Sequence, residues 1–216
     1  MAGSIHIFED RFEAGRRLAR LLDGYREESP VVYALPRGGV PVGYEISRSL
    51  GAPLEVLVSR KLGAPGQPEL GIGAVTSDGG RFLNEPLVER LGVPDEYVER
   101  VTAEESEEAS RRARLLRGGH PELEVAGRTA IIVDDGLATG ATARAAIRSM
   151  RRRGAGRLVL AVPVCAAQTE AVIRSEVEDL VSLESPGELG AIGFWYRDFT
   201  QTTDEEALDL LERTRR

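Results

Sequence analysis

Two adjacent carboxylates, Asp134 and Asp135, stand between a short apolar run at residues 130–133 and a small, hydroxyl-rich segment at residues 138–142. The apolar run predicts a buried strand, and an amphipathic helix is expected to begin after the segment. In an open α/β sheet, ligands bind where the end of a strand meets the N-terminus of the next helix. Backbone N–H groups, threonine hydroxyls and the helix dipole can bind an anion there. The carboxylates would repel that anion, and their natural partners are instead sugar hydroxyls or a hydrated metal ion. A sugar phosphate that carries Mg²⁺ would therefore fit both the hydroxyl-rich segment and the acidic pair.

Residues 131–142, IIVDDGLATGAT, resemble the phosphoribosyl pyrophosphate (PRPP) motif of the type I phosphoribosyltransferases. The match covers the apolar strand, the acidic pair and the Thr-Gly-x-Thr loop. The alternative, an aspartate capping an ordinary helix, would account for one carboxylate but not for two in tandem. The resemblance implies that Asp134 and Asp135 are catalytic residues that bind the ribose hydroxyls and, through water, Mg²⁺. It assigns the 5′-phosphate to a loop made of Ala138, Thr139, Gly140, Ala141 and Thr142.

A second candidate anion loop, LPRGG at residues 35–39, follows the strand expected at residues 30–35 and precedes a helix. Gly38 and Gly39 let backbone amides turn toward an anion. The guanidinium group of Arg37 can donate charge-assisted hydrogen bonds to phosphate oxygens. This stretch resembles the pyrophosphate loop of the same family, in which a non-proline cis peptide bond is common. A plain strand-to-helix turn is the alternative.

Lys61 is the only lysine among 28 basic residues, and it lies in a stretch at residues 59–70 that glycine and proline interrupt. We expect this stretch to be a loop. It resembles the family's long mobile loop, whose closure over the site would exclude water and prevent hydrolysis of PRPP. The resemblance implies that Arg60 and Lys61 stabilise the departing pyrophosphate and that Lys61 is catalytic. A flexible surface hairpin with incidental charge is the alternative.

Four aromatic residues gather at residues 194–199. The stretch is similar to the aromatic-Arg-Asp segment near the base pocket of purine transferases, where the arginine also approaches the pyrophosphate. The similarity implies base stacking by Phe194 and Trp195 and pyrophosphate binding by Arg197, with core packing of the rings as the alternative. Ala138 stands where transferases for 6-oxopurines usually carry an aspartate, so hypoxanthine and guanine are not expected as good acceptors.

Strands that alternate with helices predict an α/β fold, a three-layer, Rossmann-like parallel sheet as in the type I phosphoribosyltransferases, with a small hood and a flexible hairpin. A single domain is expected over residues 1–216, with its core at about 11–183 and a C-terminal hood or tail at about 184–216. A hairpin is expected around residues 77–80. The other strands are expected at 54–58, 129–133, 158–164 and 179–182, and helices at 11–22, 40–50, 97–117, 142–153, 169–175 and 204–213.

Composition narrows the classes of function. The net charge of -7 argues against a nucleic-acid surface, and no segment approaches the ~18 apolar residues of a membrane span. The N-terminus lacks the pattern of a signal peptide, and the single Cys165 cannot form an internal disulfide, so an intracellular, cytoplasmic location is expected. With only His6 and His120 as further ligands, a classical zinc site or a histidine-based triad is not expected.

These patterns predict a Mg²⁺-dependent phosphoribosyltransferase, which transfers the 5-phosphoribosyl group of PRPP to a base-like nitrogen acceptor and releases pyrophosphate. Its partners would be small molecules, and a homo-oligomer is compatible with the sequence. The alternative is a regulatory protein that binds PRPP or a nucleotide without turnover, because the motif encodes binding. A dehydrogenase or a P-loop kinase is disfavoured, since only Gly71 and Gly73 hint at a dinucleotide loop and no Gly-Lys-Ser/Thr occurs.

Overall fold

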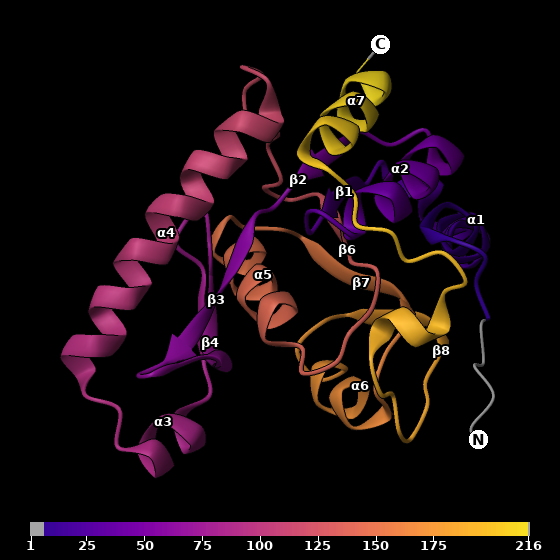
Figure 1. Ribbon diagram of the computed structural model, residues 1–216. Helices are drawn as coiled ribbons and strands as arrows, with labels where there is room; N and C mark the ends of the chain where they lie inside the picture. The colour runs from indigo at the N-terminus through magenta and orange to yellow at the C-terminus, as the bar shows by residue number, and fades with distance from the viewer. Residues whose placement is uncertain (1–6, 216) are drawn as a thin grey trace.

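The computed structural model describes residues 7–215, and its centre is a five-stranded parallel sheet (Figure 1). Every residue of the two central strands nearest the acidic pair is buried. Parallel sheets are covered on both faces, which accounts for the continuous apolar runs in the sequence. In spatial order the strands are β2 (Leu54–Val56), β1 (Val31–Ala34), β6 (Thr129–Val133), β7 (Arg157–Val164) and β8 (Asp179–Glu184).

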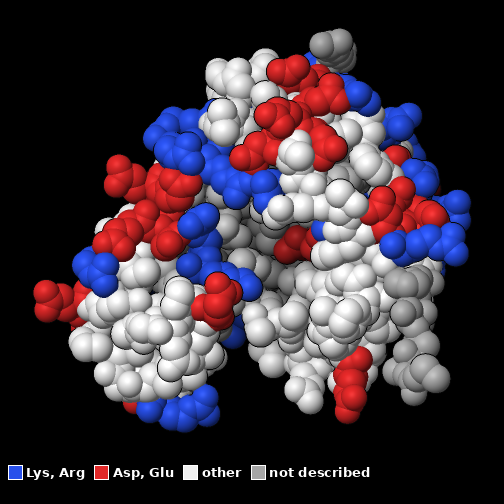
Figure 2. Space-filling view, viewed as in Figure 1, with Lys and Arg blue, Asp and Glu red and all other residues white. Residues whose placement is uncertain are grey.

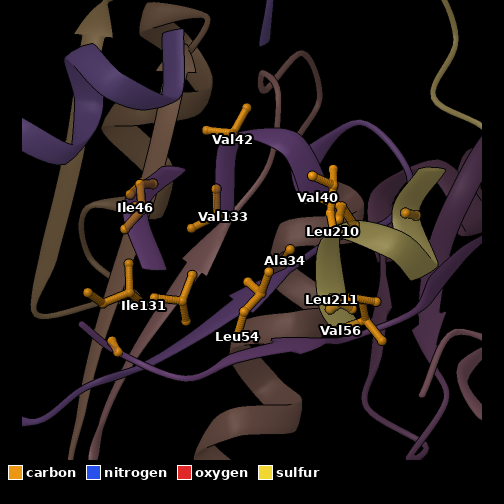
Figure 3. Close-up of a cluster of buried hydrophobic side chains, with 14 of the residues drawn as sticks. Ala34, Val40, Val42, Ile46, Leu54, Val56, Ile131, Val133, Leu210 and Leu211 are labelled. Carbon is orange, nitrogen blue, oxygen red and sulfur yellow. The ribbon is translucent and has the colours of Figure 1, made fainter. Parts of the chain in front are cut away.

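Helices cover both faces of this sheet, so the expected three-layer α/β fold is confirmed. Successive strand residues point to opposite faces, with Val32 in one hydrophobic cluster and Tyr33 in the other. Figure 3 shows part of the first cluster, in which Leu210 lies beside Val40 and Leu211 beside Val56. The first face carries α1 (Arg11–Leu21), α2 (Gly39–Leu50), α7 (Asp204–Thr214) and part of α4 (Asp95–Arg117), and the second carries α5 (Ala141–Arg152) and α6 (Ala167–Ile173).

A separate antiparallel sheet stands beside the parallel one and consists of β3 (Ser59–Ala64), β4 (Gln67–Thr76) and β5 (Arg81–Leu83). The hairpin expected around residues 77–80 is confirmed, but the expectation of a loop at residues 59–70 is wrong. This stretch instead forms the β3–β4 hairpin, because Leu62 and Ile72 are buried against valines of the helices that follow. A Cβ atom at Gly63 would lie 2.7 Å from the carbonyl oxygen of Pro68, so glycine permits the close approach where the register shifts.

We call the second sheet, α3 (Glu85–Leu91) and the N-terminal half of α4 the hairpin lobe (Figure 1). The sequence patterns did not indicate α3, although Asn84 caps its start. Within the lobe, an Arg60–Glu105 ion pair of 2.6 Å joins β3 to α4, and a hydrogen bond of 2.5 Å from Ser149 to Asp78 joins the lobe to α5. The base of the hairpin is therefore fixed at two sides.

The C-terminal part of the chain divides between the core and residues 185–203, between β8 and α7, which we call the hood region. The short 3-10 helix η2 (Ile192–Trp195) lies beside the N-terminal segment, where the backbone of Phe8 pairs with that of Tyr196. Another such helix, η1 (Asp23–Glu28), follows α1. Helix α7 packs into the main core through Leu210 and Leu211 instead of joining the hood. Within residues 7–215, no helix is long and apolar enough to cross a membrane.

Candidate functional site

The acidic pair lies at the carboxyl end of β6, where the chain leaves the sheet. Val133, the last residue of the strand, is paired with Ala34 at the end of β1, so the acidic pair and the loop after β1 are neighbours. Asp134 accepts a hydrogen bond of 2.9 Å from the backbone N–H of Asp135. Asp135 in turn forms an ion pair of 2.8 Å with Arg11, the first residue of α1. The pair is therefore held by contacts from separate parts of the chain.

Burial controls the charge of both carboxyl groups. It raises the pKa of Asp134 well above the ordinary range, and the charge of Asp135 raises it further. Burial also raises the pKa of Asp135, against the lowering effect of the Arg11 guanidinium. A cation or a set of hydroxyl donors would favour the charged form of the two groups.

The loop after β1 approaches the acidic pair closely because it carries two glycines. A Cβ atom at Gly38 would lie 2.0 Å from Oδ2 of Asp135, and one at Gly39 would lie 2.6 Å from the carbonyl oxygen of Val133. The peptide bond between Pro36 and Arg37 is cis, as the resemblance to a pyrophosphate loop implied. Any larger residue at these two positions would push the loop away from the carboxylates.

A cavity of about 470 Å³, which we call the arginine cavity, opens beside this loop. Three guanidinium groups reach it from different elements: Arg11 from α1, Arg37 from the loop and Arg112 from α4. Asp204 at the start of α7 accepts a bond of 2.5 Å from Arg112 and lies 4.0 Å from Arg37. The arginine cavity suits an anion with several oxygen atoms. The remaining lining residues include Pro36, Gly38, Asp135, Phe199, Gln201 and Thr202.

A second cavity, of about 620 Å³, lies between the hairpin lobe and the start of α5. It is lined by Thr139 and Ala141 of the hydroxyl-rich segment and by Lys61 of β3, and we call it the lysine cavity. Lys61 and Thr139 therefore line the same cavity, and Lys61 does not line the arginine cavity with Arg37. Figure 2 shows the hollow between the two parts of the molecule, with acidic atoms inside it and basic atoms along the wall formed by the hairpin lobe.

The hydroxyl-rich segment makes a tight turn into α5. Gly140 has a φ of 73°, which glycine adopts at no steric cost, and a Cβ atom there would lie 2.8 Å from Ile173. The carbonyl oxygen of Ala138 accepts a bond of 2.5 Å from Thr169 on α6. Ala138 and Thr139 are exposed at the helix N-terminus, so the turn can present backbone N–H groups to a phosphate.

Residues 2–195 match the family model described as the phosphoribosyl transferase domain. The chain belongs to this family. Two Mycobacterium tuberculosis proteins, from strains CDC 1551 and H37Rv and each named "Putative phosphoribosyl transferase", are 44% identical to it over 210 residues. The match covers 97% of the chain and 47% of each relative, so the chain spans about half the length of these curated proteins.

Two solved structures resemble this phosphoribosyl transferase domain. A Thermus thermophilus protein, TT1426, is 38% identical with a TM-score of 0.81, and the match covers 95% of the present chain and 98% of the other. A hypothetical protein from Neisseria gonorrhoeae, solved with bound ppGpp, covers 96% of both chains at 11% identity and a TM-score of 0.52. The second likeness concerns the fold alone.

Some predicted site residues of the phosphoribosyl transferase domain lie away from both cavities. Arg60 is engaged by Glu105, and Arg197 forms an exposed ion pair of 3.2 Å with Glu9. Phe194 is 66% exposed, whereas the indole N–H of Trp195 donates to the carbonyl oxygen of Leu189 at 3.0 Å. Among the predicted pyrophosphate residues, the structure therefore places Arg37 and Gly38 at the arginine cavity.

Three residues around the acidic pair were missed by sequence reasoning. Arg11 pairs with Asp135, Arg112 lines the arginine cavity, and the hydroxyl of Tyr196 donates to the backbone oxygen of Asp135 at 2.6 Å. The sequence patterns predict the helix that carries Arg112 but give this residue no role. One feature of the sequence could have indicated that Arg112 lies near the core. Arg112 borders the stripe of residues Ala109, Ala113 and Leu116, which the helix buries.

Proposed function

We propose that this domain binds PRPP across the two cavities and transfers its 5-phosphoribosyl group to a nitrogen acceptor, with release of pyrophosphate. The supporting observation is that the acidic pair at the end of β6 is followed directly by the segment 138–142 and is approached closely by Gly38 of the loop after β1. The segment 138–142 would bind the 5′-phosphate, and Asp134 and Asp135 would bind the ribose hydroxyls. The arginine cavity, which Arg37 and Gly38 line and which Gly39 follows in the chain, would then receive the pyrophosphate group.

In this reaction the acceptor nitrogen attacks C1 of the ribose from the face opposite the pyrophosphate. The bond from C1 to the pyrophosphate oxygen breaks, and its electron pair leaves with the pyrophosphate, so that C1 is inverted. Because the acceptor itself is the nucleophile, the contribution of the protein is positioning and electrostatic stabilisation. The carboxylates fix the sugar while the guanidinium groups stabilise the charge that develops on the leaving group.

The residues present fit a Mg²⁺ ion that is shared with the substrate. Asp134 and Asp135 supply carboxylate oxygens, which Mg²⁺ prefers, and residues 7–215 contain no cluster of three or more metal-ligating side chains. A site with two carboxylates matches an ion that takes its other ligands from water and substrate phosphates. Bound Mg²⁺ would neutralise the charge of the pyrophosphate and so improve it as a leaving group.

Lys61 would act once the hairpin closes over bound PRPP. In the structure Lys61 is exposed and lines the lysine cavity, as Thr139 does. The base of the hairpin is fixed by Asp78 and by the Arg60–Glu105 pair, whereas Gly66 at the tip meets no neighbouring atoms within 4 Å of a Cβ. Closure of the tip over bound PRPP would exclude water, while Lys61, which pairs with Ala74 near the fixed base, would reach the reacting groups by movement of its own side chain.

The central test is PRPP binding by the wild type and by a variant with both Asp134→Asn and Asp135→Asn. We expect isothermal titration with PRPP and Mg²⁺ to show binding by the wild type and severe loss in the variant, with circular dichroism unchanged. Incubation with a panel of nucleobases, while pyrophosphate is followed, would then separate a transferase from a protein that only binds PRPP. Equal affinity in wild type and double variant would contradict the proposed site.

A further inference from the structure

Arg112 on α4 has donor capacity that the protein itself does not use. Its side chain is 19% exposed and one terminal nitrogen, Nη2, donates to Asp204 at 2.5 Å. The Nε atom is buried and has no hydrogen-bond partner among the described residues. A guanidinium carries five N–H donors, and leaving buried donors unpaired is costly. An anion bound in the arginine cavity, which Arg112 lines, would supply this guanidinium with a further acceptor.

The position of Arg112 indicates what that acceptor is. Arg112 lines the arginine cavity with Arg37, and Asp204 holds both side chains on one side of that cavity. Asp135 lines the same cavity, so a group attached to C1 of a ribose bound at the acidic pair would extend into it. The 5′-phosphate would lie at the opposite end, near Thr139.

We propose that Arg112 is a pyrophosphate-binding residue of this domain, and that α4 thereby completes a pyrophosphate subsite begun by Arg37 and Gly38. This inference rests on the proposed function. A guanidinium can bind two phosphate oxygens at once, which a diphosphate offers and a lone sugar hydroxyl does not. The packed stripe of Ala109 and Ala113 beside Arg112 keeps the helix, and with it the charge, in place without a ligand.

The chain offers a matched control on the same helix. Arg111 is the preceding residue, but its side chain is 62% exposed and is paired with Glu108 at 2.7 Å, away from the arginine cavity. Both Arg111→Ala and Arg112→Ala remove one positive charge. Any difference between them therefore reports position and not net charge.

The test compares two probes, inorganic pyrophosphate and ribose 5-phosphate, each titrated calorimetrically with Mg²⁺ present. We expect Arg112→Ala to weaken pyrophosphate binding about tenfold or more, as for the loss of a charge-assisted hydrogen bond, and to leave ribose 5-phosphate binding within about twofold. Arg112→Lys should lie between wild type and alanine, because it keeps the charge but loses the planar fork. Arg111→Ala should leave both affinities unchanged.

Ribose 5-phosphate also reports whether each variant is folded, since it uses the acidic pair and the segment 138–142 but not the arginine cavity. If Arg112→Ala weakens both probes equally, or binds pyrophosphate like the wild type, the assignment of Arg112 is wrong while the proposed function stands. A wild type that binds ribose 5-phosphate but not pyrophosphate also overturns the inference alone. A wild type that binds neither overturns the proposed function together with the inference.

Discussion

The guanidinium of Arg11 and the carboxylate of Asp135 form an ion pair of 2.8 Å between residues that are 124 positions apart. Arg11 also donates to the carbonyl oxygen of Thr200 at 2.8 Å, and its guanidinium carbon lies 3.9 Å from the centroid of the Phe199 ring. One side chain thus connects the first turn of α1, the acidic pair and the hood region. The charge of Asp135 depends on this connection, because Arg11 opposes the effect of burial on its pKa.

Replacing Arg11 by alanine should shift the pH dependence of PRPP binding. Without the guanidinium, the pKa of Asp135 rises further, so the carboxylate is protonated at a higher pH than in the wild type. Binding that needs the charged form should then weaken more at pH 6 than at pH 8. Titrations with PRPP and Mg²⁺ across this range measure the shift. Arg16→Ala, on the exposed side of α1, is the control, and identical profiles for both variants would contradict the role of Arg11.

A methyl group at Gly38 should disturb the site directly. The added Cβ would lie 2.0 Å from Oδ2 of Asp135, so either the carboxylate or the loop must move. We expect Gly38→Ala to lower PRPP affinity by about tenfold or more and to destabilise the fold by about 1–3 kcal/mol, as for overpacking. Gly24→Ala is the control, since a Cβ there meets no atom within 4 Å. Calorimetry with PRPP and thermal unfolding would show whether both effects occur.

Asp134→Asn should stabilise the ligand-free protein while it weakens PRPP binding. Burial raises the folded-state pKa of Asp134, so the folded state is penalised once the pH exceeds the unfolded-state pKa of about 3.9. The amide removes this penalty and can still accept the bond from the N–H of Asp135. We expect the Tm at pH 8 to rise by about 2–4 °C, which corresponds to about 1 kcal/mol in a chain of this size.

The pH dependence of that effect provides its control. The difference in Tm between wild type and Asp134→Asn should be fully present above the folded-state pKa of Asp134. It should shrink as the pH falls toward 4, where the wild-type carboxyl is protonated in the folded state and increasingly so in the unfolded state. A Tm difference that is constant from pH 8 to pH 4 would show that the carboxyl charge is not its cause.

Local patterns in the sequence were sufficient for the parallel sheet and for the acidic motif. The strand at residues 129–133 is a continuous apolar run after its first residue, and Asp134 and Asp135 follow it directly. The β3–β4 hairpin was not recognised because Gly63 and Pro68, which allow its strands to approach, are the residue types that usually indicate a loop. Its strands are determined instead by burial against α3 and α4, which no local pattern displays.

The charged partners of the site depend on tertiary structure. Arg11 reaches Asp135 only because the start of α1 docks beside the end of β6, and Arg112 reaches the arginine cavity only because α4 packs against the core. The periodicity of a helix predicts which of its charged residues lie at the surface. It does not predict which residue elsewhere in the fold each of them will pair with. Arg60 illustrates the opposite case, since it lies beside Lys61 in sequence yet is engaged by Glu105.

Lys61→Ala should lower kcat far more than it weakens PRPP binding. In the structure Lys61 lies at the lysine cavity and not beside Arg37, so it would meet the reacting groups only after closure of the hairpin tip. An interaction made only in the transition state affects kcat, and one such contact accounts for a loss of ~10²-fold. Steady-state rates of pyrophosphate release, with a nucleobase that the wild type uses, test this. Full activity of the variant would show that the lone lysine is incidental.

The aromatic residues at positions 194, 195 and 199 should differ in their effects on the KM values for the acceptor and for PRPP. Trp195→Ala is expected to raise the KM for the acceptor and to leave that for PRPP nearly unchanged, with Phe194→Ala as the parallel variant for the more exposed ring. Phe199 differs from both because it lines the arginine cavity, and because the guanidinium carbon of Arg11 lies 3.9 Å from the centroid of its ring. Phe199→Ala should therefore raise both KM values.

The absence of an acid or base side chain at position 138 predicts which bases are poor acceptors. Ala138 offers no acid or base group beside a bound base, and the aromatic surface offers π-faces that every base can use. Hypoxanthine and guanine should therefore be poor acceptors, and discrimination among bases that do react should be modest. Competition between pairs of nucleobases, measured as kcat/KM ratios, tests both statements. Efficient turnover of hypoxanthine or guanine would refute the argument from Ala138, and an unaltered acceptor KM in Trp195→Ala would remove Trp195 from the acceptor site.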